Sequence, residues 1–97
     1  MWGVYVEFLV AIEVVGLDAL PDEEVRDLRG REKTAGLRHL EAGTLVRMWR
    51  MPGRRSAIGL WRVQDAELHR HLSSRPLFKY LDITVTPLAR HYLEEGE

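Results

Sequence analysis

Apolar and polar residues alternate along the first segment of the chain. Over residues 2–12 every even position is apolar, whereas the odd positions mix apolar side chains with Glu7. This period of two predicts a strand with one buried face. The even positions carry Trp2, Val4, Val6, Phe8, Val10 and Ile12, and the odd positions include Tyr5, Leu9 and Ala11. We therefore expect the second face of this strand to be largely apolar as well.

Glycine and proline residues divide the remaining chain into further elements. A segment rich in Glu, Arg, Leu and Ala follows Pro21 and ends at Gly43, a composition typical of a helix. Pro52 and Gly53 supply turn chemistry between two strand-like runs, which predicts a hairpin. The expected elements are strand 2–12, helix 23–42, strands 45–51 and 56–63, a helix from Gln64 or Asp65 to Leu72, strand 80–86, and a tail from Pro87.

The order of these elements, β-α-β-β-α-β, is the ferredoxin-like pattern of α+β proteins. It predicts a single domain of residues 1–97, in which two helices cover one face of a four-stranded antiparallel sheet. Large apolar residues are expected on both faces of the sheet, because the strands carry more of them than one face accounts for. The additional ones are Tyr5, Leu9, Leu45, Trp49 and Trp61. An antiparallel sheet that is exposed on one side normally shows a polar face. We therefore expect a second copy of the chain to cover this face, the alternative being that the C-terminal tail folds over it.

One charged residue of the expected helix falls among its apolar positions. At about 100° per residue, the inward stripe consists of Val25, Leu28, Ala35, Gly36 and His39, with Leu40 at its edge. Glu32 lies in the middle of this stripe, whereas Arg31 and Arg38 point outward. A carboxylate that faces the core is costly to keep charged without a partner, and a group so placed suits a general acid or base. The structural alternative is that Glu32 pairs with Lys33, Arg29 or an arginine of the sheet.

Composition and charge narrow the range of functions. The 97 residues include 14 Lys and Arg against 15 Asp and Glu, and the net charge of −1 offers no basic footprint for nucleic acid or an anionic membrane. The chain has no cysteine, which excludes disulfides and cysteine nucleophiles. Residues 2–15 lack the features of a signal peptide and are too few to span a bilayer, so we expect a cytoplasmic protein. The four histidines are not spaced as shared metal ligands, and no metal is expected.

Four arginines, Arg47, Arg50, Arg54 and Arg55, gather around the expected hairpin. The balanced net charge argues against a nucleic-acid patch. Guanidinium groups near a pocket instead fit binding of a small carboxylate, which they hold with two hydrogen bonds. The alternative is a solvated turn, above all for Arg54.

The segment from Pro76 to His91 resembles the C-terminal signature of the muconolactone isomerases. It reads PLFKYLDITVTPLARH and meets every fixed position of the pattern P-L-F-x-Y-x-D-I-x-V-x-x-L-x-R-H. The upstream matches, in the family's order and spacing, are Glu32-Lys33, Gly43-Thr44, Trp49-Arg50 and Gly53. The resemblance covers nearly the whole chain. It implies a ferredoxin-like fold in a homo-oligomer built from dimers, typically a decamer.

The same resemblance implies a cofactor-independent isomerase of aromatic catabolism. Such enzymes convert muconolactone into the enol-lactone of 3-oxoadipate. One base moves a proton between ring carbons. The family's shuttle glutamate falls on Glu32, with Lys33 as a neighbouring partner for a carboxylate or oxyanion. Arg50 would hold the substrate carboxylate, and Leu77 and Phe78 would either wall the pocket or only pack.

The chain also departs from the family's pattern. It has Arg55 and Ala57 where the family's enzymes carry a tyrosine and an asparagine, and Tyr5 where they carry a histidine. With the base kept and its orienting groups replaced, Arg55 and Tyr5 would help to bind a different acid or lactone. We therefore expect an isomerase that acts on a small lactone or carboxylic acid. Two alternatives are a cyclase-like enzyme of secondary metabolism on the same scaffold and a non-catalytic protein that binds a small acid.

Overall fold

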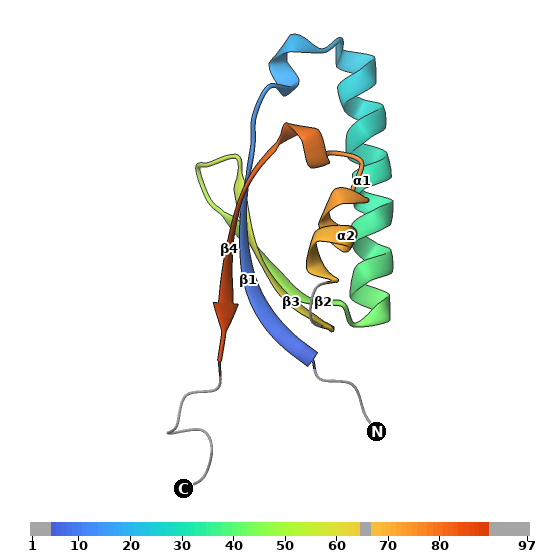
Figure 1. Ribbon diagram of the computed structural model, residues 1–97. Helices are drawn as coiled ribbons and strands as arrows, with labels where there is room; N and C mark the ends of the chain where they lie inside the picture. Colours follow the sequence, from blue (N-terminus) through green and yellow to red (C-terminus); the bar gives the residue numbers. More distant parts are fainter. Residues whose placement is uncertain (1–4, 65–66, 90–97) are drawn as a thin grey trace, which may run out of the picture.

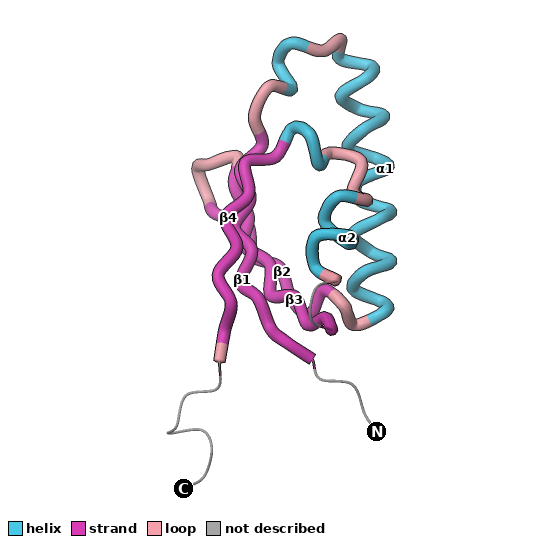
Figure 2. Tube along the Cα trace, in the orientation of Figure 1, coloured by secondary structure: helices cyan, strands magenta, loops and turns pink. Residues whose placement is uncertain are grey.

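A computed structural model describes residues 5–64 and 67–89 of the chain (Figure 1; Figure 2). Its elements are β1 (Tyr5–Val14), the 3-10 turn η1 (Leu17–Ala19), α1 (Asp22–Ala42), β2 (Leu45–Met51), β3 (Ser56–Gln64), α2 (Leu68–Ser73), the 3-10 turn η2 (Phe78–Tyr80) and β4 (Leu81–Leu88). The start of the expected first strand, a helix start at Asp65 and the end of the tail lie outside the described residues.

The four strands form one antiparallel sheet in the order β2-β3-β1-β4. Both helices lie on the same face of this sheet (Figure 1), where α1 contacts β2 and α2 contacts β3. The order of elements and the two layers confirm the expected α+β, ferredoxin-like architecture.

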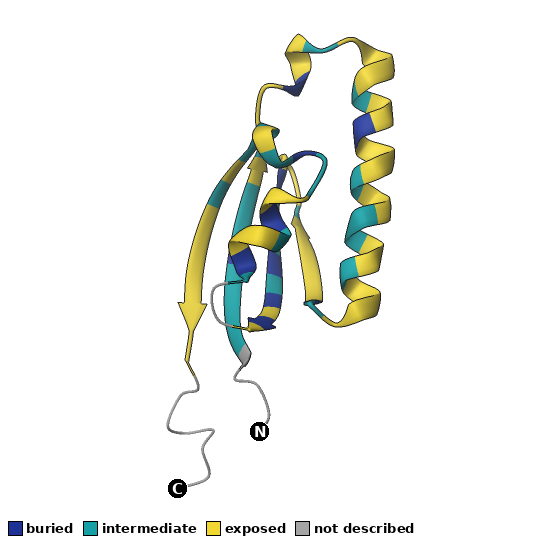
Figure 3. Ribbon diagram, turned by 45° about the vertical axis from the view of Figure 1, so that its right-hand side comes forward, coloured by how far each residue is buried: buried dark blue, intermediate teal, exposed yellow. Residues whose placement is uncertain are grey.

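The helix α1 has helix-stabilising groups at both ends. Three carboxylates, from Asp22, Glu23 and Glu24, stand in its first turn, where they interact favourably with the helix dipole. Gly43 ends the helix with a φ of 80°, and its N–H donates to the carbonyl of Leu40 (3.1 Å). The inward stripe is also confirmed, because its members are buried or half-buried while the outward arginines are exposed (Figure 3).

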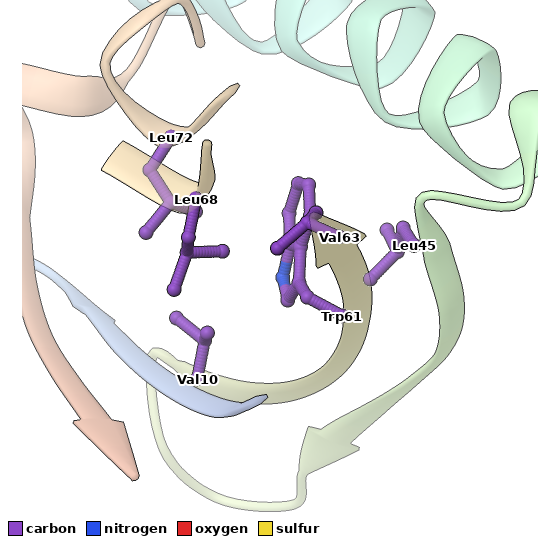
Figure 4. Close-up of a cluster of buried hydrophobic side chains, with 6 residues drawn as sticks. All are labelled: Val10, Leu45, Trp61, Val63, Leu68 and Leu72. Carbon is purple, nitrogen blue, oxygen red and sulfur yellow. The ribbon is translucent and has the colours of Figure 1, made fainter. Parts of the chain in front are cut away.

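The core consists of two apolar clusters on the helix-covered face. Figure 4 shows the first cluster beneath α2, made of Val10, Leu45, Trp61, Val63, Leu68 and Leu72. The even positions of β1 contribute to it as the alternation predicts, since Val10 is buried and Phe8 and Ile12 pack against it. The second cluster, Leu17, Leu28 and Leu77, joins the start of α1 to the loop before β4.

The structure extends three strands beyond their expected ends. β1 continues to Val14, which pairs with Leu81, and β4 continues through Pro87 to Leu88. We expected Pro87 to begin a tail. It is tolerated because β4 is an edge strand, where a missing N–H can face away from the ladder. Gln64 ends β3 and does not begin the second helix.

The second face of the sheet is uncovered in the single chain. The pairing register places on this open face Leu9 and Ala11 of β1, Trp49 and Met51 of β2, and Ile58 and Leu60 of β3. Trp49 is 46% exposed. Glu7 and Arg62 form an ion pair across the same face (2.8 Å). Leu45 and Trp61 lie instead in the core. The open face therefore carries fewer large apolar residues than we expected from the sequence.

Neither helix of the described residues is both long and apolar enough to cross a membrane.

Candidate functional site

Glu32 lies on the inward face of α1, where the helical spacing predicts it, and its side chain is 16% exposed. Its Oε2 atom forms an ion pair with Nη2 of Arg75. Its Oε1 atom accepts a hydrogen bond from the backbone N–H of Leu77 (3.2 Å). Arg75 thus takes the place of the cations considered from the sequence, Lys33 and Arg29 among them. A carboxylate held by two donors still has free lone pairs with which to accept a proton.

Arg75 stands in the loop between α2 and β4, and successive turns position it. Its N–H donates to the carbonyl of Leu72 (3.1 Å), and its own carbonyl accepts from the N–H of Phe78 (3.0 Å). The side chain is only 9% exposed. Gly36 of α1 leaves room for it, since a Cβ at that position would lie 3.0 Å from Nη2 of Arg75.

Two aromatic side chains, His39 and Trp61, lie near the Arg75 guanidinium. Its Nη1 lies 3.5 Å from Nδ1 of His39, and its Cζ lies 6.0 Å from the centre of the Trp61 ring. The His39 ring is 5.0 Å from Trp61 and 5.5 Å from His71. Burial lowers the pKa of His39, as do the neighbouring Arg75 and His71, whereas Glu32 acts in the opposite direction. A neutral His39 can accept a hydrogen bond from the guanidinium.

A hollow with mainly apolar walls opens beside the Glu32–Arg75 pair, and we name it the carboxylate hollow. Its walls are Val10, Ile12, Met48, Trp61, Leu72 and Leu81. Apolar surroundings strengthen electrostatic interactions because the local dielectric is low. A base and a cationic donor side by side in such a place suit proton abstraction next to a carbonyl group.

A second hollow shares Ile12 with the first and is lined by guanidinium groups, so we name it the arginine hollow. Its arginines are Arg29, Arg50, Arg54 and Arg55, over a floor that includes Val14 and Ala57. The structure thus brings together Arg50 and Arg55, the two residues assigned to the substrate carboxylate. Arg55 also pairs with Asp18 on the surface (3.1 Å). Several guanidinium groups around one hollow suit an anion.

Three other predicted site residues, Lys33, Leu77 and Phe78, border neither hollow. Lys33 is exposed on α1. Leu77 is buried in the second core cluster and reaches Glu32 through its backbone N–H only. Phe78 is half-buried against the first cluster. Tyr5 begins β1, and its side chain lies outside the described part of the structure.

A further hollow between β3 and α2 lies away from Glu32. Its charged residues have partners nearby, since Arg62 pairs with Glu7 (2.8 Å) and Arg70 with Glu67 (3.0 Å). Among residues 5–64 and 67–89, no three His, Asp or Glu side chains are grouped as metal ligands.

Sequence reasoning missed Arg75, because no local spacing links it to Glu32. It stands directly before the Pro76–His91 segment and outside the matched pattern. One signal was available in Gly36, a residue without a side chain in the middle of the inward stripe. A glycine at such a place indicates that another side chain approaches the helix closely.

The fold and the site define a small α+β protein in which a largely buried carboxylate lies beside a hollow lined by guanidinium groups. Comparison with known proteins agrees with this class. The family model described as muconolactone delta-isomerase matches residues 6–94. Muconolactone Delta-isomerase 1 from Acinetobacter lwoffii is 35% identical over 85 residues, which cover 87% of this chain and 88% of that protein.

Two further comparisons cover much of the chain. The Muconolactone Delta-isomerase of Rhodococcus opacus is 36% identical over 72 residues, or 72% of this chain and 77% of that protein. A crystal structure of muconolactone isomerase matches with a TM-score of 0.80 and 32% identity, over 89% of this chain and 91% of that one. The chain belongs to the muconolactone delta-isomerase family, as the resemblance of its C-terminal segment predicts. It is therefore an isomerase of aromatic-compound catabolism.

Proposed function

We propose that this isomerase moves a proton on muconolactone or on a closely related lactone that carries a carboxylate. The position of Glu32 carries the proposal. Its side chain borders a hollow with apolar walls, and this hollow adjoins the arginine hollow through Ile12. The carboxylate hollow has a volume of about 20 Å³, enough for a single group of the substrate, and the arginine hollow one of about 240 Å³. A ring bound in the arginine hollow can therefore point its reacting part toward Glu32.

Glu32 is the base in this proposal. It removes a proton from a ring carbon next to the double bond that is conjugated with the lactone carbonyl. The C–H electron pair then moves through the conjugated system onto the carbonyl oxygen. The carboxyl group then returns the proton to a different ring carbon, and the carbonyl re-forms. Substrate and product have the same atoms and electrons, so the step needs no oxidant or reductant.

Arg50 and Arg55 hold the free carboxylate of the substrate. Both line the arginine hollow, Arg50 from β2 and Arg55 from the hairpin. Binding of a group that does not react is uniform along the reaction, and its loss raises KM with little change in kcat. Arg50→Ala is therefore expected to raise KM about tenfold. Arg38→Ala, on the exposed side of α1, is the matched control and leaves KM unchanged.

The ultraviolet absorbance of muconolactone during incubation with the protein tests the reaction directly. Glu32→Gln keeps the size of the side chain but removes the base, and is expected to lower kcat by at least about a hundredfold. Glu41→Gln changes an exposed carboxylate of the same helix and leaves kcat unchanged. Turnover by Glu32→Gln at the rate of the unmodified protein would refute the mechanism.

The same incubation separates the two other functions considered from the sequence. A protein that binds the lactone without converting it acts as a binding protein, and one that closes a new ring acts as a cyclase. Membership of the isomerase family favours neither.

The proposal also includes a second copy of the chain on the open face. Nine apolar side chains are buried among residues 5–64 and 67–89, a small core for that part of the chain. Trp49 stands exposed on the open face beside the half-buried Ile58 and Leu60. A charge on a covered face is costly to bury, so Trp49→Asp, on the edge strand β2, is expected to shift a dimer to monomers in sedimentation velocity.

Leu37→Asp is the control for this surface, because Leu37 is 55% exposed on α1 and away from the sheet. It leaves the sedimentation coefficient unchanged. An unmodified protein that sediments as a monomer at micromolar concentration contradicts the dimer and favours cover by the C-terminal tail. Assembly into a decamer and a cytoplasmic location stay predictions.

A further inference from the structure

Arg75 carries a hydrogen-bond donor that the fold leaves unused. Its Nη2 pairs with Glu32, and its Nη1 faces Nδ1 of His39. Its Nε is buried and has no acceptor among the described residues. A buried donor without an acceptor is unfavourable for stability alone. A buried donor without an acceptor in a native structure calls for an explanation, and a role in the chemistry of the site is one.

The same guanidinium is held in one position before any ligand binds. Glu32 fixes one end of it, and the Trp61 ring lies 6.0 Å from its Cζ. Gly36 gives it room against α1, since any Cβ there would approach Nη2 to 3.0 Å. A charged donor that is already oriented, in surroundings with little water, is the arrangement that stabilises a developing negative charge most strongly.

We infer that Arg75 binds the carbonyl oxygen of the substrate and stabilises the negative charge that develops there. This inference rests on the proposed function, in which Glu32 is the base. Both residues border the carboxylate hollow, so a carbonyl group that meets Arg75 has its conjugated carbons near Glu32.

Arg75 takes part in the step without exchanging a proton. Glu32 takes the proton from carbon, the electron pair of that bond reaches the carbonyl oxygen, and the oxygen accepts hydrogen bonds from the guanidinium. When Glu32 returns the proton to another carbon, the electron pair leaves the oxygen again. A guanidinium stays protonated throughout, so it serves as a donor and not as an acid.

A purely structural role for Arg75 is the competing explanation, because its pair with Glu32 also ties the loop before β4 to α1. The two roles differ in kinetics. A donor to the oxyanion acts in the transition state, so its loss lowers kcat and leaves KM nearly unchanged. A donor that only supports the fold affects stability, and added guanidinium ion does not restore its contribution to kcat.

The experiment measures isomerisation of muconolactone by Arg75→Ala and Arg75→Lys in D2O, with NMR detection of ring-proton exchange. We expect kcat of Arg75→Ala to fall about a hundredfold or more and to recover in part with guanidinium ion below denaturing concentration. Arg75→Lys keeps the charge without the planar donor set, and its kcat is expected to lie between those of Arg75→Ala and the unmodified protein. Arg70→Ala removes an exposed arginine of α2 and shows neither loss nor recovery. Circular dichroism establishes that each variant is folded.

The outcomes separate this inference from the proposed function. Three results would overturn the inference. They are a kcat of Arg75→Ala within tenfold of that of the unmodified protein, a change confined to KM, and a loss of kcat in a folded variant that guanidinium ion does not restore. If Glu32→Gln is inactive at the same time, the proposed function stands without Arg75. If the unmodified protein neither isomerises muconolactone nor exchanges its ring protons, the proposed function and the inference both fail.

Discussion

Replacement of Arg75 by methionine tests whether the Glu32–Arg75 pair has the energetics of a buried ion pair. The two side chains are 16% and 9% exposed, so neither charge recovers its water when the other is removed. Loss of one partner from a buried pair costs about 3–5 kcal/mol, because an uncompensated charge is left behind. Methionine keeps much of the apolar volume. We expect the free energy of unfolding of Arg75→Met to fall by about 3–5 kcal/mol at neutral pH.

Urea denaturation at a fixed protein concentration measures this loss, and a double-mutant cycle assigns it. In Glu32→Gln combined with Arg75→Met both charges are absent, and replacing a whole buried pair is often neutral. We therefore expect the double variant to regain most of the stability lost by Arg75→Met. Arg31→Met is the control, because Arg31 pairs with Asp27 on the surface, where the side chains are 59% and 67% exposed. Its cost is expected to stay below about 0.5 kcal/mol.

Two results would refute the reasoning. One is a cost for Arg75→Met below about 1 kcal/mol, as for an exposed pair. The other is a double variant that is no more stable than Arg75→Met, since the loss then comes from packing and not from the charge on Glu32.

The remaining predictions concern α1. Alanine normally stabilises a helix by roughly 0.5–1 kcal/mol relative to glycine. Gly36→Ala is expected to lower kcat and to gain none of this stability, because its Cβ would meet Nη2 of Arg75 at 3.0 Å. Gly30→Ala, whose Cβ would have no atom within 4 Å, is expected to gain the full amount in urea denaturation. Burial lowers the pKa of His39 from its usual 6.5, so on acidification the unfolded chain takes up this proton first, and stability falls below about pH 6.5 by at most about 1.4 kcal/mol per pH unit. His39→Gln removes this part of the pH dependence, and the exposed His69→Gln keeps it.

Each of these predictions has its own contrary result. Equal gains in stability for the two alanine variants, with kcat unchanged, show that Arg75 moves away from Gly36 without consequence. A free energy of unfolding that falls between pH 7 and pH 5 as steeply in His39→Gln as in the unmodified protein shows that another group binds the proton.

The fold was largely predictable because its signals are local. The alternation over residues 2–12 depends only on the two faces of a strand, and it correctly predicts that Val10 is buried. The ends of strands were not predictable in this way. Pro87 belongs to β4 because it pairs with Phe8 of β1, and that depends on a neighbour distant in the sequence.

The site was predictable to the same extent and for the same reason. The inward position of Glu32 follows from the spacing of α1 alone, and the structure confirms it. The identity of its partner does not follow, because Arg75 comes from a loop that only the packing of α2 and β4 brings to α1. Lys33 is the neighbour in sequence, but the next residue on a helix turns by about 100°, which leaves it exposed.

The cost of the Glu32–Arg75 pair argues that it serves chemistry. A pair of well-packed apolar residues in its place is often as stable or more stable, and Gly36 weakens the helix that accommodates the pair. The second core cluster already ties the loop before β4 to α1 through Leu77, so the loop has an attachment without the ion pair. Apolar residues cannot supply a carboxylate and an oriented guanidinium at one hollow. The buried Nε of Arg75 has no acceptor among the described residues. A site that transfers a proton and stabilises the resulting oxyanion needs both groups.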